Sequence, residues 1–105
     1  MHAVIIKVVM NDREAILGAL PGVVIPLVQR NPGLIHGYIT MRDNTGMGFW
    51  LVDSEEHANL MYTEVEARRH KLPPEVTLDG VEVREVVAHA EGAMAALAGG
   101  APAVS

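Results

Sequence analysis

Six side chains of this sequence have the chemistry to bind or transform a small molecule. They are Lys7, His36, Tyr38, Thr40, Trp50 and His70. A tryptophan ring offers a surface on which an aromatic compound can stack, and lysine, histidine and tyrosine can stabilise an oxyanion such as a phenolate. We treat the six residues as candidates for a ligand-binding site and assign no catalytic residue.

Trp50, the only tryptophan of the chain, supports two interpretations. A lone tryptophan in a small domain usually fills the core. The ring could instead line a pocket with His36 and Tyr38, because polar rings on a buried face need hydrogen-bond partners that a ligand or water supplies. For the pocket we expect Trp50→Ala to cost about 1–2 kcal/mol of stability, against about 3–5 kcal/mol for a core tryptophan.

Lys7 interrupts an apolar segment and also supports two interpretations. Its ammonium group could bind an anion or a phenolate. Alternatively, it could form an ion pair with Glu85 on the last predicted strand.

Composition excludes several classes of function. The 105 residues provide for one domain, and the absence of cysteine excludes disulfides and thiolate chemistry. A net charge of −5 leaves no basic surface for nucleic acid or anionic lipid. We find no histidine pair with metal-ligand spacing and no glycine-rich phosphate loop, so we expect neither a metal nor a nucleotide. The short N-terminal apolar segment is neither a signal peptide nor a membrane span, and we expect a soluble, cytoplasmic protein.

Periodicity predicts the element order β-α-β-β-α-β. Strands are expected over residues 2–10, 34–42, 47–52 and 81–89, and helices over residues 12–30 and 54–71, the first disturbed by Pro21 and Pro26. Right-handed connections then give a ferredoxin-like α+β fold, a four-stranded antiparallel sheet with two helices on one face. This domain occupies residues 1–90. Residues 91–105 form an Ala/Gly-rich tail that we expect to be partly disordered and dispensable for folding.

The turn between the two central strands determines which residues share a face. We predict a three-residue turn with a bulge at Gly46, which pairs Thr40 with Trp50 and Tyr38 with Val52. One face of this hairpin is then almost wholly apolar, and Trp50 lies on the other, mixed face. A two-residue turn would place Trp50 on the apolar face.

The first strand is apolar on both faces apart from Lys7. A sheet with helices on one side only leaves its other face bare. A second copy of the chain is the simplest cover, so we predict a homodimer.

Four segments resemble the antibiotic biosynthesis monooxygenase-like family of dimeric α+β barrels: "MHAVIIKVVMND", "NPGLIHGY", "VDSEEHAN" and "VEVREVVAH". The resemblance covers about residues 1–90. It implies a small-ligand-binding homodimer similar to monooxygenases that oxidise aromatic or phenolic compounds without a cofactor. A non-catalytic binding or accessory module and a haem-binding or haem-degrading protein are the alternatives, because the family contains haem-degrading members and members of unknown function.

The family motifs map onto this sequence with substitutions. The tryptophan that ends the third strand in family oxygenases is replaced by Val52, and Trp50 lies two residues earlier. The partner asparagine would fall at Gly48 or Phe49. Lys7 occupies the first-strand asparagine position of haem-degrading members, and His70 lies near the position of their histidine.

Overall fold

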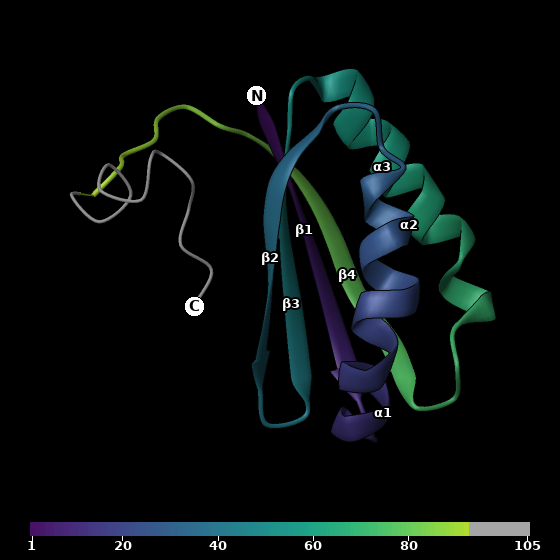
Figure 1. The fold of residues 1–105 in the computed structure, drawn as a ribbon. Helices are drawn as coiled ribbons and strands as arrows, with labels where there is room; N and C mark the ends of the chain where they lie inside the picture. The colour runs from purple at the N-terminus through teal and green to yellow at the C-terminus, as the bar shows by residue number, and fades with distance from the viewer. Residues whose placement is uncertain (93–105) are drawn as a thin grey trace.

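The computed structural model describes residues 1–92, and its strands and helices follow the predicted order (Figure 1). The strands are β1 (His2–Met10), β2 (Leu34–Arg42), β3 (Thr45–Val52) and β4 (Val76–Glu85). They form one antiparallel sheet in the order β2-β3-β1-β4, with the helices on one side. This α+β arrangement is compatible with the predicted ferredoxin-like fold. Most of the predicted tail, residues 93–105, lies outside the described residues.

The first helical segment is divided into α1 (Arg13–Ala19), the π-helical η1 (Leu20–Val24) and α2 (Ile25–Gln29). Asp12 caps α1 by accepting a hydrogen bond from the amide of Ala15 at 3.1 Å. Pro21 and Pro26 cannot donate backbone hydrogen bonds, and the backbone widens between them into the π-helical turn. The predicted disturbance at the two prolines therefore takes the form of a π-helix within one continuous segment.

The second helix, α3 (Glu55–Ala67), begins as predicted at Ser54, whose hydroxyl accepts from the amide of His57 at 3.2 Å. Beyond its end the basic residues form the 3₁₀ turn η2 (Arg69–Lys71). Arg69 pairs with Glu66 at 2.9 Å and donates to the carbonyl of Leu78 on β4 at 3.0 Å. The Arg69 guanidinium holds the pKa of the Glu66 carboxyl below its usual range. This basic run therefore anchors the end of the helix to the sheet.

The predicted bulged turn between β2 and β3 is wrong. Arg42 pairs with Thr45, so the turn contains only Asp43 and Asn44, and Tyr38 pairs with Phe49. Asp43 adopts φ 52°, a left-handed conformation that aspartate tolerates better than most residues. The shorter turn moves Trp50 onto the face covered by the helices, where burial of its large apolar ring favours this register.

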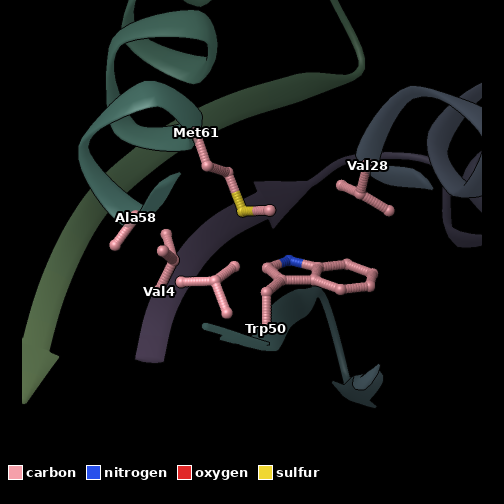
Figure 2. Packing of buried hydrophobic residues seen from close by; sticks show 6 residues of the cluster. Val4, Val28, Trp50, Ala58 and Met61 are labelled. Carbon is pink, nitrogen blue, oxygen red and sulfur yellow. The ribbon is translucent and has the colours of Figure 1, made fainter. Parts of the chain in front are cut away.

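The core between sheet and helices is built around Trp50 (Figure 2). The indole is 5% exposed and packs with Val4 of β1, Val28 of α2 and Met61 of α3. Gly37 and Gly48 lie beneath the ring, and a Cβ atom at Gly48 would come within 2.8 Å of the indole nitrogen. Two glycines on neighbouring strands thus provide the space that the indole occupies.

β4 begins five residues earlier than predicted, at Val76, because a bulge near Asp79 continues the pairing with β1. Among residues 1–92, none of the helices has the length and apolar character needed to cross a membrane.

Candidate functional site: a hollow on the outer face of the sheet

The sheet face opposite the helices, called here the outer face, is defined by the strand register. Side chains on this face come from alternate residues, and cross-strand partners form rows. One row contains Tyr38, Phe49, Ile5 and Glu82, and the next contains Thr40, Met47, Lys7 and Gly80. Four of the six predicted site residues, Lys7, His36, Tyr38 and Thr40, therefore share the outer face.

The outer face has an apolar half and a hollowed half. The apolar half, near the beginning of β1, contains Ala3, Ile5, Phe49 and Leu51. Phe49 is 38% exposed, a large value for an aromatic residue in a central strand.

The hollowed half lies toward the β2–β3 turn and contains an open depression of about 460 Å³, called here the outer-face hollow. Its lining includes Lys7, Thr40, Arg42, Met47, Phe49 and Asp79. Phe49 and Met47 provide an apolar floor on β3, while the charged side chains come from the strands on either side. The hollow thus combines apolar surface with a few polar groups, as small-molecule sites do.

Lys7 has an ion-pair partner different from the predicted one. Its Nζ atom lies 3.5 Å from Glu82, which also pairs with Arg84 at 3.2 Å. Glu85 lies opposite His2 in the strand register, at the far end of β1 from Lys7, so the predicted Lys7–Glu85 ion pair is wrong. Arg84, together with the charge of Lys7, holds the pKa of the Glu82 carboxyl below its usual range.

The threonine hydroxyls of the hollow already donate to the backbone. Thr40 donates to the carbonyl of Met47 at 3.0 Å, and Thr45 donates to the carbonyl of Arg42 at 2.8 Å. Their oxygens can still accept hydrogen bonds, so donors to an anionic ligand have to come from Lys7 and Arg42.

The remaining predicted site residues are separated from the hollow. His36 and Tyr38 lie on the outer face beyond it, with their ring centroids 5.8 Å apart and the rings inclined at 68°. Trp50 lies on the opposite face, in the core. His70 is exposed in η2 and lines neither the outer-face hollow nor a narrow gap between α2 and α3.

Sequence reasoning missed Phe49, Arg42, Met47 and Asp79 as residues of the hollow. The signal that could have found the first three is the Asp43-Asn44 pair read as a two-residue turn, because this register places Phe49, Met47 and Arg42 on the same face as Lys7. Asp79 could not be found in this way, since it belongs to a bulge in a segment predicted as loop.

A second polar cluster joins the segments before β2 and after β3. Buried Asn31 donates to the carbonyl of His57 and accepts from the amide of Gly33, each at 2.9 Å. His57 Nδ1 lies 2.6 Å from Asp53 Oδ1, and this hydrogen bond holds the pKa of the Asp53 carboxyl below its usual range. A side chain at Gly33 would collide with both members of the pair. The cluster is a structural junction between "NPGLIHGY" and "VDSEEHAN", because its polar groups are directed at one another.

Solved structures that share this fold include three proteins of low sequence identity. HapK from Hahella chejuensis superposes with a TM-score of 0.64 at 10% identity, over 89% of this chain and 99% of its own. NE2512, a protein of unknown function from Nitrosomonas europaea, superposes with a TM-score of 0.56 at 15% identity, over 88% of this chain and 95% of its own. MupZ from Pseudomonas fluorescens gives 0.61 at 11% identity over 78% of this chain, which spans 65% of the length of MupZ.

No protein-family model and no curated protein sequence matches the chain. At 10–15% identity the structural similarity shows the fold alone, a small α+β domain with a four-stranded antiparallel sheet.

Proposed function

We propose that the protein is a homodimer that binds a small aromatic or phenolic compound in the outer-face hollow, as a member of the dimeric α+β barrel class. The observation that carries the ligand proposal is the hollow itself, where Met47 lies between Lys7 and Thr40 on neighbouring strands and exposed Phe49 lies in the adjacent row. An aromatic ring placed on Phe49 gains apolar burial, and an oxygen on that ring can reach the ammonium group of Lys7.

The dimer proposal depends on the apolar half of the outer face. Within residues 1–92, the helices cover only the opposite face of the sheet (Figure 1). The strand register places Ile5, Phe49 and Leu51 on the face away from the helices, and Phe49 is 38% exposed. A second copy placed on this half would bury the apolar surface and leave the hollow at one end of the shared barrel. Such an interface should bury more than about 1,000 Å² in total.

The finer proposal concerns the reaction. In oxidation without a cofactor, a deprotonated phenol supplies the electrons that reduce O₂, and the protein contributes by stabilising the phenolate. Lys7, a cation in the lining of the hollow, is the residue that we assign to this role. Phe49 takes the stacking role that the sequence suggested for Trp50.

A non-catalytic binding or accessory module is the second candidate, favoured by the packing of the core. On the helix side of the sheet, the gap lined by Val28, Met61 and Arg68 amounts to about 20 Å³, too small for an organic ligand. Trp50 and the helices fill the rest of that region. A non-catalytic module would still form the dimer, but no reaction would take place in the outer-face hollow.

Titration of the ¹⁵N-labelled full chain with 2-naphthol tests ligand binding. We expect chemical-shift changes centred on Lys7, Thr40 and Phe49, and a weaker affinity for Phe49→Ala. Tyr62→Ala is the matched control, because Tyr62 on α3 is 40% exposed and lies away from the hollow. Shifts centred on Trp50 and Met61, or no saturable shifts, would contradict the proposed site. Oxygen consumption with the same phenol separates the enzyme from the non-catalytic module.

A further inference from the structure

Two cations of the outer-face hollow stand on opposite sides of its apolar floor. Lys7 comes from β1 and Arg42 from β2, with Met47 of β3 between them. Two strand spacings separate β1 from β2 by about 10 Å, and Arg42 lies one row nearer the turn than Lys7. Lysine and arginine side chains are long enough to converge over Met47 from these positions, Lys7 by turning from Glu82 on β4 toward β3.

The charge around the hollow is positive although the chain is acidic overall. Glu82 is shared by Lys7 and Arg84, so one carboxylate faces two cations. Arg42 forms no ion pair within the part of the chain that the structure describes, residues 1–92. The lining of the hollow itself carries two cations, Lys7 and Arg42, and one carboxylate, Asp79, in a chain whose net charge is −5. A local excess of positive charge on an acidic protein favours an anionic ligand.

The apolar floor restricts the shape of this anion. Phe49 offers an exposed ring, and Met47 a flexible thioether that adapts to flat ligands. Because the threonine hydroxyls donate to the backbone, Lys7 and Arg42 are the donors left for the anionic group. An inorganic anion would leave Phe49 unused, and a neutral aromatic compound would leave Arg42 unpaired.

We propose that the outer-face hollow recognises aromatic carboxylates, with the carboxylate held between Lys7 and Arg42 and the ring on Phe49 and Met47. This inference rests on the proposed ligand-binding function and narrows it to one substrate class. Arg42 provides the planar, bidentate partner that a carboxylate prefers, and Lys7 adds a point charge.

The test compares 2-naphthoate with 2-naphthalenemethanol, a neutral probe with the same ring system, by calorimetry and by amide shifts of the full chain. We expect the carboxylate to bind about fivefold more tightly than the alcohol, the range of one partly exposed charge interaction. Lys7→Met and Arg42→Gln should each remove most of this preference, and 1 M salt should weaken the binding of the carboxylate only. Lys71→Met, on the η2 turn and outside the lining of the hollow, is the matched control and should leave both affinities unchanged.

The outcomes separate the two proposals. Equal binding of both probes, with shifts at Phe49 and Thr40, would overturn the preference for carboxylates and leave the ligand site standing. Saturable binding of neither probe by folded wild-type protein would overturn both. A carboxylate preference that persists in Lys7→Met and Arg42→Gln, each verified as folded by circular dichroism, would show that other groups hold the anion and would also overturn the inference.

Discussion

At the scale of single residues, Trp50 and the glycines beneath it determine how the core is filled. The indole lies between the sheet and the helices, and Gly37 and Gly48 leave space for its ring. Both glycines occupy strand positions that would otherwise favour larger side chains. Their small size is therefore part of the packing of Trp50.

Trp50→Ala should destabilise the protein by about 3–5 kcal/mol, the cost of emptying a large site in a packed core. This exceeds the cost expected from the sequence for a pocket residue, because the indole is 5% exposed. Urea denaturation measures the change, and acrylamide quenching of the wild type should be weak. Strong quenching together with a loss below about 2 kcal/mol would contradict the core assignment.

Gly37→Ala should destabilise the fold by about 1–3 kcal/mol, because the new methyl group collides with the indole of Trp50 and approaches the carbonyl of Phe49. Gly80→Ala is the matched control on the same sheet, since a Cβ there meets nothing within 4 Å. Its effect should stay within about 0.5 kcal/mol. Thermal melts of the two variants in the same buffer measure both losses of stability. Equal decreases in melting temperature for Gly37→Ala and Gly80→Ala would contradict the tight packing of the indole on Gly37.

At the scale of elements, local signals set the helix ends and a tertiary cluster joins them to the sheet. Asp12 and Ser54 cap their helices through hydrogen bonds to amides three residues later. The cluster of Asn31, Gly33, Asp53 and His57 connects the end of the first helical segment with the start of α3. We expect this junction to depend on pH through Asp53.

Asp53→Asn should lower stability at neutral pH but reduce the loss of stability in acid. Since the hydrogen bond from His57 lowers the pKa of Asp53 in the folded protein below 3.8, the carboxylate contributes stability above that value. This contribution disappears as the pH falls below 3.8 through the folded pKa. The difference in the free energy of unfolding between wild type and variant, measured by denaturant melts from pH 7 to pH 3, should therefore become smaller in the acidic range.

Glu64→Gln on the exposed side of α3 provides the control for general acid effects. A difference between wild type and Asp53→Asn that stays constant down to pH 3 would contradict the role assigned to the pair.

At the scale of the whole molecule, helices cover one face of the sheet, and the other face has apolar side chains on its surface. The exposure of Phe49 amid Ile5 and Leu51 is the feature that favours a second copy. The outer-face hollow lies beside this apolar half, so ligand binding and assembly would share one face.

Phe49→Glu should convert the proposed dimer to a folded monomer, because it places a charge at the edge of the apolar half, where that half borders the outer-face hollow. Tyr62→Glu, at a similarly exposed aromatic residue on α3, should remain dimeric. Light scattering at micromolar concentration measures both masses, with circular dichroism to verify folding. A monomeric wild-type protein, or a Phe49→Glu variant that stays dimeric, would contradict an interface on the outer face.

Most of the secondary structure could be predicted from the sequence because its signals are local. A short segment rich in β-branched residues indicated β1, the capping residues indicated where α1 and α3 begin, and the two prolines indicated the break that became the π-helical turn. These preferences act over a few residues and do not depend on distant partners. The order of elements and right-handed connections then indicated the four-stranded sheet.

The assignment of β3 residues to faces was decided only by the tertiary structure. Side chains alternate along a strand, so a change of one residue in the turn exchanges every residue of β3 between the faces. Turn preferences and hairpin pattern favoured the bulged turn, whereas burial of Trp50 over Gly37 and against Val28 and Met61 required the shorter one. The hairpin sequence is compatible with both turns. Because that burial involves residues from three separate segments, the hairpin sequence alone did not decide that Phe49 rather than Trp50 lies on the same face as Lys7.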